Sequence, residues 1–199
     1  MGTSFSFDDV FVRHNFFSEQ EVNDFCDKQN TTSDEGWDDA GVISNGVSSY
    51  DPDFRKAKIK TPKIHKDNPF LVKLVYGAVV ANEFKFKQPI ARYCGEGLNL
   101  LKYGNDNGRF KIHNDTISPE GTRALTTIIL LSDPQDYEGG ILYFYTDRPG
   151  NPGSRKFRNN IKKGTLVTFP SLMYHEVTPV TSGTRLSLVM WSHKERSNG

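Results

Sequence analysis

The sequence predicts a single α+β domain in which short antiparallel strands form a sandwich or barrel and two helices cover one outer face. Two observations predict this class. Both segments with helical spacing of apolar residues lie in the N-terminal half of the chain. From Ile90 onward the pattern changes to short apolar segments separated by Gly, Pro, Asn and Asp. At 199 residues, one domain with one core is the default.

The composition is that of an ordinary globular protein. The 25 Lys and Arg residues nearly balance the 24 Asp and Glu residues, so no global field favours nucleic acid or a membrane surface. No apolar run approaches the roughly 20 residues that span a bilayer, and the N-terminus lacks the pattern of a signal peptide. Cys26 and Cys94 are far apart and form no CxxC motif, which favours reduced thiols over a disulfide framework. We therefore expect a cytoplasmic protein.

Two segments carry the signals of a helix N-terminus. Ser18 and Glu21 have the spacing of a capping box, and apolar residues follow at helical intervals. Asn68 precedes Pro69, a residue suited to the first helical turn, and helical spacing continues to near Asn82. These signals predict a short amphipathic helix after Ser18 and a second helix that ends near Asn82.

The segments around these helices are less regular. Residues 30–55 are rich in Asn, Asp, Ser and Gly and predict a loop with at most one short strand. After them, Lys56, Lys58 and Lys60 alternate with smaller and apolar residues, which predicts an edge strand with a solvated basic face.

The C-terminal half contains at least six strand-like segments. They are Leu98–Tyr103, Arg123–Leu131, Ile141–Thr146, Thr165–Phe169, His175–Pro179 and Arg185–Trp191. Many short strands with turns between them are typical of antiparallel sandwiches and barrels. The leading architecture is a double-stranded β-helix (jelly roll) core at about 91–193, preceded by a helical and lid region at about 1–90, with all of 1–199 forming one domain.

His113 and Asp115 lie two residues apart in "RFKIHNDT". On one interpretation they are ordinary polar residues that face solvent at the end of a strand. On the other they are two of three ligands to a redox metal, since this spacing puts both side chains on one side of a strand. His175, from a hairpin partner, would be the third. Two imidazoles and one carboxylate on one face suit iron(II) and leave positions open for other ligands.

Arg185 follows His175 by ten residues. Alone it would be a surface ion pair, but a guanidinium can also bind a carboxylate through two parallel hydrogen bonds. Ser187 points the same way as Arg185 and is either a further donor or a solvated polar residue. Tyr103 offers a phenol at the same kind of site, or is a half-buried strand aromatic. Gly139-Gly140 would allow a tight reversal of the chain.

The joint pattern resembles the iron(II)/2-oxoglutarate-dependent dioxygenases, and most closely their prolyl 4-hydroxylase branch and related bacterial hydroxylases. The resemblance rests on H-x-D at 113–115, the distal His and the Arg ten residues later. It also rests on the stretches "LLKYG", "GRFKIHND", "RALTTIILLSDPQDYEGGILYF" and "KKGTLVTFPSLMYHEVTPVTSGTRLSLVMW". It covers most of the chain and is strong from about Leu98 to Trp191.

The resemblance implies a set of site residues and cofactors. The implied iron ligands are His113, Asp115 and His175, which with Arg185 make up the catalytic set. Arg185 would bind the far carboxylate of 2-oxoglutarate, with Tyr103 and Ser187 in the same cosubstrate pocket. The implied cofactors are iron(II), 2-oxoglutarate and O2, with bound ascorbate as the reductant.

Other positions bear on the cosubstrate and the substrate. Some family members have a Tyr that helps to hold the cosubstrate carboxylate where this chain has Leu130. Arg55 matches a family position near the substrate entrance, or is a solvated arginine. Trp37 and Tyr50 would belong to a mobile substrate lid, or anchor the early loop to the core. The basic stretches 55–66 and 154–163 are either a positive groove for an acidic peptide or nucleic-acid strand, or solvated faces. His14, His65 and His193 are expected at the surface.

We therefore expect a dioxygenase, similar to procollagen-proline 4-dioxygenase, that hydroxylates a proline in a peptide or protein. The alternatives are hydroxylation of another side chain, a free amino acid or a nucleobase, and a catalytically silent jelly roll that binds a partner. The family resemblance also implies that Asp115 favours hydroxylation over halogenation, which goes with Gly or Ala at that position. We expect no membrane and no nucleic acid among the partners. The oligomeric state stays open, with a monomer favoured.

Overall fold

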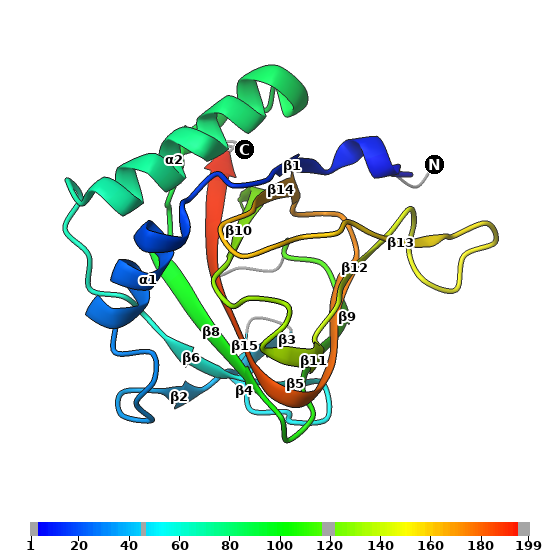
Figure 1. Ribbon diagram of the computed structural model, residues 1–199. Helices are drawn as coiled ribbons and strands as arrows, with labels where there is room; N and C mark the ends of the chain where they lie inside the picture. The colour runs from blue at the N-terminus through cyan, green and yellow to red at the C-terminus, as the bar shows by residue number, and fades with distance from the viewer. Residues whose placement is uncertain (1–3, 45–46, 117–121, 195–199) are drawn as a thin grey trace.

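Apart from one hairpin, the strands that the structure describes form two antiparallel sheets that share one long strand (Figure 1). The computed structural model describes residues 4–44, 47–116 and 122–194. Every strand pairing within this part of the chain is antiparallel. The predicted α+β class with a jelly-roll core is therefore confirmed. That the chain forms one domain stays a prediction.

The first sheet lies under the helices. Its order is β1 (Phe11–Arg13), β14 (Leu166–Pro170), β10 (Arg123–Leu130), β15 (His175–Lys194), β8 (Leu98–Gly104), β6 (Lys58–Lys60) and β2 (Asp38–Asp39), with β7 (Ile90–Arg92) beside the end of β15.

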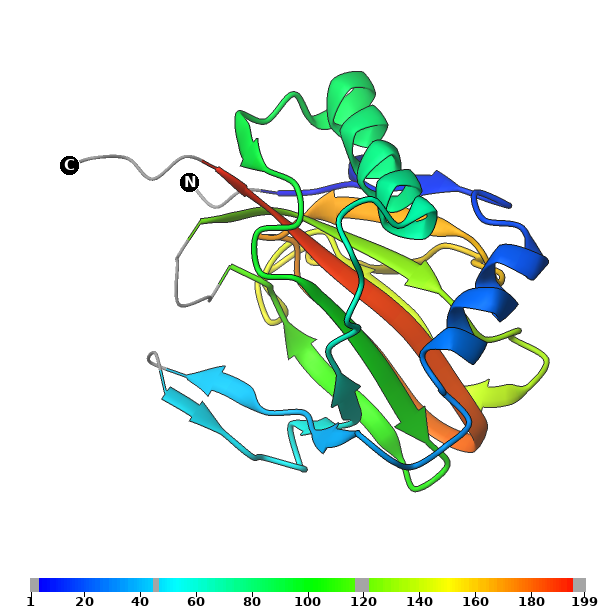
Figure 2. The same ribbon diagram turned by 90° about the vertical axis from the view of Figure 1, so that its left-hand side faces the viewer.

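The second sheet continues from the first half of β15. Its order is β13 (Lys156–Arg158), β12 (Leu142–Tyr145), β15, β9 (Gly108–His113) and β5 (Arg55–Lys56), with β11 (Tyr137–Gly139) beside the turn of β15. A separate hairpin of β3 (Val42–Ser44) and β4 (Val47–Ser49) extends away from the helices (Figure 2).

Strand β15 joins the two sheets. The sequence predicts two strands here, at His175–Pro179 and Arg185–Trp191, but the structure has one strand from His175 to Lys194. Its first part pairs with β9 and β12, and its second part pairs with β8 and β10. Gly183 has a φ of 70° in the bend between the two parts. A side chain there would come within 2.0 Å of the Asp136 carbonyl oxygen, so the bend favours glycine.

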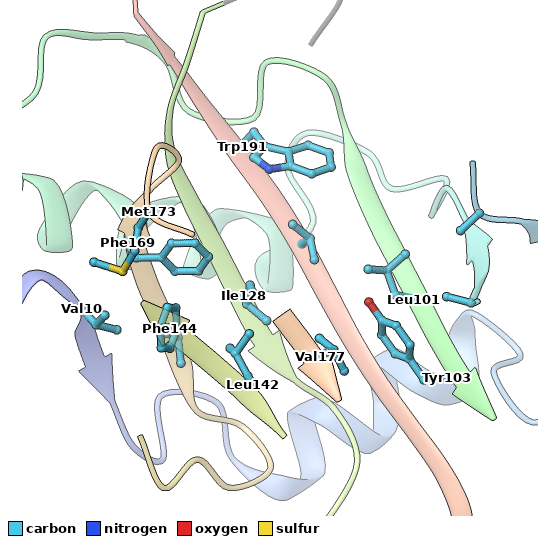
Figure 3. Packing of buried hydrophobic residues seen from close by; sticks show 14 of the residues in the cluster. Val10, Leu101, Tyr103, Ile128, Leu142, Phe144, Phe169, Met173, Val177 and Trp191 are labelled. Atoms are coloured by element: carbon cyan, nitrogen blue, oxygen red, sulfur yellow. The ribbon is translucent and has the colours of Figure 1, made fainter. Parts of the chain in front are cut away.

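The strands bury one set of side chains on each face. Ile128 and Leu101 point between the two sheets, where aromatic residues from β12 and β14 meet them (Figure 3), and Val189 belongs to the same cluster. Their neighbours along the strands, such as Leu188 and Leu100, point to the opposite face. This period-2 alternation is what a sheet buried on both faces requires. The inner face forms the wall of the candidate site.

The two helices cover the outer face, as predicted. Helix α1 spans Glu19–Lys28 and helix α2 spans Pro69–Ala81, and both pack against the first sheet (Figure 1). The predicted capping box is present, since the Glu21 N–H donates to Ser18 Oγ at 3.2 Å and Glu21 accepts from the Ser18 N–H at 2.8 Å. A 3-10 turn (Phe7–Asp9) and a π-helical turn (Asn82–Phe86) complete the helical segments that the structure describes.

Two local predictions are wrong. The segment of Lys56, Lys58 and Lys60 forms two short strands: β5 ends the second sheet, but β6 is not an edge strand, because it pairs with β8 on one side and with the two-residue strand β2 on the other. The described part of 30–55 contains three short strands and the first residue of β5, not one strand at most. Cys26 and Cys94 are free thiols, as expected. In the described part of the chain, no helix is long and apolar enough to cross a membrane.

Candidate functional site

A cavity of about 520 Å³ opens between the two sheets. Inner-face residues of β8, β10 and β15 line it, among them Tyr103, Ile128 and Trp191 (Figure 3). The ionisable side chains on its wall, apart from Tyr residues, are Arg55, His113, Asp115, Arg123, His175 and Arg185. Such a mixture of apolar walls and a few converging polar groups is typical of a ligand site.

Three of these side chains converge on one point. His113 ends β9 and His175 begins β15, and the two residues are direct partners in the antiparallel ladder. Asp115 follows β9 by two residues. The Nε2 atoms of His113 and His175 lie 3.6 Å and 3.5 Å from the carboxylate oxygens of Asp115. One ligand atom from each residue lies within 4.8 Å of the others, which is a spacing that can hold a metal ion.

Hydrogen bonds orient the two imidazoles for coordination. Nδ1 of His113 lies 2.7 Å from the Lys111 carbonyl oxygen, and Nδ1 of His175 lies 3.0 Å from the Met173 carbonyl oxygen. A carbonyl oxygen only accepts, so each Nδ1 carries the proton and each Nε2 keeps its lone pair. Metal-binding imidazoles are commonly fixed in this way.

The environment also sets the ionisation of the cluster. Burial, together with the neighbouring His175, lowers the pKa of His113 to about 3, so this imidazole is neutral at pH 7. Burial raises the pKa of Asp115, but the imidazoles of His175 and His113 and a hydrogen bond from Thr126 lower it by more. The result is a neutral imidazole beside an ionised carboxylate, the forms in which these groups bind metal.

Arg185 offers an open edge to the same cavity. The residue is 1% exposed, and its Nη1 donates to Ser187 Oγ at 3.0 Å. Its Nε and Nη2 are enclosed and have no hydrogen-bond partner in the described part of the chain. Leaving buried N–H groups without an acceptor is costly, so this edge fits a ligand with two acceptor oxygens. A carboxylate has that geometry. Tyr103 lies beside it, with the ring centroid 5.4 Å from the guanidinium carbon.

Gly140 makes room for Arg185. A Cβ atom on Gly140 would lie 2.8 Å from Cδ of Arg185, and its φ of 57° also favours glycine. Tyr137 lies near the same guanidinium: burial raises the pKa of its phenol, and the charge of Arg185 opposes that rise. The double glycine is visible in the sequence, whereas no motif marks Tyr137.

A second group of polar residues, which no sequence motif indicated, lies around Arg123 on the cavity wall. The Nε atom of Arg123 donates to Glu96 at 2.8 Å, Nη2 also bonds to Glu96, and the guanidinium lies 3.6 Å from the Trp191 ring centroid. Its Nη1 donates to the Asp115 carbonyl oxygen at 3.4 Å. His193 is not at the surface, as the sequence suggested, but is fully buried with Nε2 3.0 Å from Glu96.

The structure brings only one of the three expected substrate residues to the cavity. Arg55 is on its wall. Trp37 is not among the lining residues: it packs beside the outer cluster, and its Nε1 donates to the Ser33 carbonyl oxygen at 3.0 Å. Tyr50 is 55% exposed and also lies off the cavity wall.

Known proteins share parts of this sequence. Residues 98–193 match the model of a family described as the 2OG-Fe(II) oxygenase superfamily. The PKHD-type hydroxylase azo0608 of Azoarcus sp. (strain BH72) is 34% identical over 130 residues, which cover 62% of this chain and 54% of that protein. The PKHD-type hydroxylase NE2125 of Nitrosomonas europaea is 29% identical over 163 residues, covering 76% and 66%. The chain thus spans between half and two thirds of the length of these two relatives.

Solved structures show the same fold. A prolyl-4-hydroxylase from Pseudomonas putida superposes with a TM-score of 0.70 at 16% identity, covering 94% of both chains. The carbocyclase SnoK from nogalamycin biosynthesis gives 0.70 at 17% identity, covering 94% of this chain and 79% of the other. A prolyl hydroxylase from Trichoplax adhaerens gives 0.66 at 18% identity, covering 94% and 84%. These similarities confirm the jelly-roll fold.

Proposed function

Because residues 98–193 match the model of the 2OG-Fe(II) oxygenase superfamily, we propose that the chain is an iron(II)- and 2-oxoglutarate-dependent dioxygenase that hydroxylates a proline in a peptide or protein. One observation carries this proposal. The cluster of His113, Asp115 and His175 and the open edge of Arg185 line the same cavity. A single dicarboxylic acid can therefore approach a metal at one end and a guanidinium at the other.

The residues of the chain divide the work between them. Nε2 of His113, Nε2 of His175 and the Asp115 carboxylate would hold the iron. When bound, iron(II) with 2-oxoglutarate and O2 supplies the oxidising power to hydroxylate a C–H bond. Arg185 would grip the far carboxylate of 2-oxoglutarate through Nε and Nη2, with Ser187 holding Nη1 in place. We further propose ascorbate as the reductant that keeps the iron ferrous.

The apolar wall has its own task in this proposal. Leu101, Ile128 and Val189 line the same cavity as the charged groups and would limit the water around them. Exclusion of water strengthens the pairing of Arg185 with a carboxylate, because the local dielectric constant falls. Tyr103, which is 1% exposed, would add a phenol beside the same carboxylate.

The proposal that the substrate residue is a proline is supported by the names of similar proteins. The curated relatives are named PKHD-type hydroxylases, and solved neighbours include prolyl hydroxylases, one of them in complex with a fragment of a hypoxia inducible factor. Hydroxylation of another side chain or a small molecule is the second candidate, since a carbocyclase and an epimerase share the fold. We propose a cytoplasmic, single-domain monomer that acts on a peptide or protein and binds no nucleic acid.

The test is release of labelled carbon dioxide from 2-oxoglutarate. The purified protein is incubated with iron(II), ascorbate, labelled 2-oxoglutarate and a library of proline-containing peptides, and the peptides are read by mass spectrometry for a one-oxygen gain. We expect 2-oxoglutarate turnover that the peptides stimulate, and no turnover in Asp115→Ala or His175→Ala. Absence of both turnover and 2-oxoglutarate binding would overturn the enzyme class. A one-oxygen gain on free nucleotides or small acids alone would overturn the prolyl assignment.

A further inference from the structure

Arg55 repeats the bonding pattern of Arg185 at a different point on the cavity wall. Its Nη1 donates to the Gly41 carbonyl oxygen at 2.9 Å, and its Nε is enclosed without a hydrogen-bond partner among the residues that the structure describes. In both arginines Nη1 donates a hydrogen bond within the protein, whereas Nε has no acceptor among the described residues. In a guanidinium, Nε and Nη2 form the edge that binds a carboxylate through two parallel hydrogen bonds.

An aromatic ring lies against this guanidinium. The guanidinium carbon of Arg55 lies 4.4 Å from the centroid of the Phe110 ring. The imidazole of His113 stacks on the same ring at 3.5 Å with 17° between the planes. An imidazole that close covers one face of the ring, so Arg55 must occupy the other. The ladder explains the arrangement, since Arg55 on β5 is the direct partner of Phe110 on β9. Arg55 is thereby separated from the proposed metal ligand by one aromatic ring.

The other guanidiniums of the cavity have partners that Arg55 lacks. Arg123 is bonded twice to Glu96, so its charge is compensated inside the protein. Arg185 has the far carboxylate of 2-oxoglutarate under the proposed function. No carboxylate lies within ion-pair distance of Arg55 in the described ranges. Burial lowers the pKa of Arg55, and the more distant Tyr103 and Asp115 oppose this only in part.

When the formal charges in the filled site are summed, only the positive charge of Arg55 has no counter-charge. The two positive charges of ferrous iron and the one on Arg185 equal the three negative charges of Asp115 and 2-oxoglutarate. The pair of Arg123 and Glu96 adds nothing to this balance. A largely buried cation without a counter-ion is unfavourable, and its open Nε adds the cost of a lost hydrogen bond. The missing partner is an anion that enters with the substrate.

We propose that Arg55 binds a carboxylate of the primary substrate, so that the site selects peptides with an acidic side chain or a free carboxyl terminus close to the target proline. This inference rests on the proposed function and specifies its substrate class. Tyr103 lies near this subsite and the cosubstrate end, since Arg55 and Arg185 both lower the pKa of its phenol, although burial raises that pKa by more. The carboxylate of the substrate therefore binds beside 2-oxoglutarate, not in its place.

The experiment compares matched peptides. Each N-acetylated peptide has one central proline. One pool carries a single Asp or Glu, stepped through the three positions on either side, with an amidated C-terminus. A second pool carries Asn or Gln at the same positions. A third pool is neutral but ends in a free carboxylate at a stepped distance from the proline. Binding to the protein with iron(II) and 2-oxoglutarate is measured by calorimetry under nitrogen, and hydroxylation is measured in air.

Three variants separate a carboxylate contact from a structural role. Arg55→Gln removes the charge, and Arg55→Lys keeps the charge but not the forked edge. Lys56→Gln is the control, because Lys56 is the next residue on β5, pairs with Asp106 at 3.0 Å and lies off the cavity wall. Carbon dioxide release without peptide and the affinity for 2-oxoglutarate are measured in all of them.

In the wild type and in Lys56→Gln we expect an acidic pool, or the pool with the free terminus, to bind on the order of 10–100-fold more tightly than the amide pool. Which of the two is preferred identifies the source of the carboxylate. The preference should disappear in Arg55→Gln and weaken in Arg55→Lys. Equal binding of all pools to the wild type, or a preference that survives in Arg55→Gln, would overturn the inference. If the wild type shows no 2-oxoglutarate turnover at all, the proposed function itself would be overturned.

Discussion

The hydroxyl of Thr126 on β10 donates a 2.8 Å hydrogen bond to Oδ2 of Asp115. The backbone N–H of Asp115 also donates to the Ser171 carbonyl oxygen at 2.8 Å. Asp115 lies beyond the end of β9, so the ladder of that strand does not hold it. These two bonds, one from β10 and one to the residue that follows β14, position the carboxylate against the imidazoles.

Removing the Thr126 hydroxyl should weaken metal binding without abolishing it. Thr126→Val keeps the shape of the side chain but leaves the carboxylate free to rotate. We expect the affinity for iron(II), measured by titration under nitrogen, to fall on the order of 10–100-fold. The matched control is Thr127→Val, because Thr127 is equally buried on the same strand and bonds to Thr168 at 3.1 Å. A metal affinity that falls equally in both variants would contradict this role of Thr126.

A methyl group at position 140 should disturb the cosubstrate end. In Gly140→Ala the new Cβ would press on Cδ of Arg185, at 2.8 Å, and on Val180, at 3.0 Å. We expect the KM for 2-oxoglutarate to rise on the order of tenfold, in the same direction as in Arg185→Ala. Gly150→Ala is the control, since that glycine also has a positive φ of 97° but has no atom within 4 Å of the new Cβ. An unchanged KM in Gly140→Ala would show that Arg185 adapts without loss.

The buried partner of Arg123 should matter for stability. Glu96→Gln leaves the guanidinium without its counter-ion beside the buried His193. Breaking a buried ion pair on one side costs on the order of 3–5 kcal/mol, so urea unfolding should show a loss in this range. In Asp106→Asn, which removes the partner of the more exposed Lys56, the loss should stay below about 1 kcal/mol. Similar losses in the two variants would mean that burial of the Arg123–Glu96 pair does not increase its contribution to the free energy of unfolding.

The contact between the two helices should depend on pH. The Lys73 ammonium, with hydrogen bonds from Ser18, lowers the pKa of Glu21 below its ordinary value of 4.5. A carboxylate whose pKa is lower in the folded state stabilises the fold above the unfolded pKa. That contribution disappears as the pH falls through the folded pKa. The group is 41% exposed, so screening limits its value at pH 7 to about 0.2–1 kcal/mol.

The measurement is the free energy of unfolding of the wild type and Glu21→Gln in urea at several pH values. The difference between the two proteins should be present at pH 7 and should vanish below the pKa of Glu21. Added salt should reduce it at pH 7. A difference that persists in acid would assign the effect to the hydrogen bonds of the cap and not to charge.

Local signals explain why the helices could be predicted. The capping box at Ser18 and the Asn68-Pro69 pair act within one turn of the chain, and the structure begins both helices there. Short apolar segments separated by Gly, Pro, Asn and Asp identified most of the core strands in the same way. Pro179 and Gly183 are such separators in the middle of β15, so the sequence indicated two strands. In the structure, the ladder shifts its register beside Pro179 and continues.

Long-range contacts mark the limit of the sequence analysis. The pairing of His113 with His175 follows from the register of two distant strands, which the sequence suggested only through the spacing of metal ligands. His193 has no such motif around it, and its contact with Glu96 depends on how β15 lies against the segment before β8. Trp37 carries no local signal either. Its position depends on the packing of the early loop against the outer cluster.

The shared strand β15 has a consequence for synthesis. β15 follows β7, β8, β9, β10, β11 and β12 in the chain and pairs with all of them. Those strands leave the ribosome before the strand that orders them, so their edges remain open until residues 175–194 emerge. Open edges are prone to intermolecular pairing. The nascent chain is therefore most exposed to aggregation just before translation of this strand is complete, and holdase chaperones should engage it in that interval.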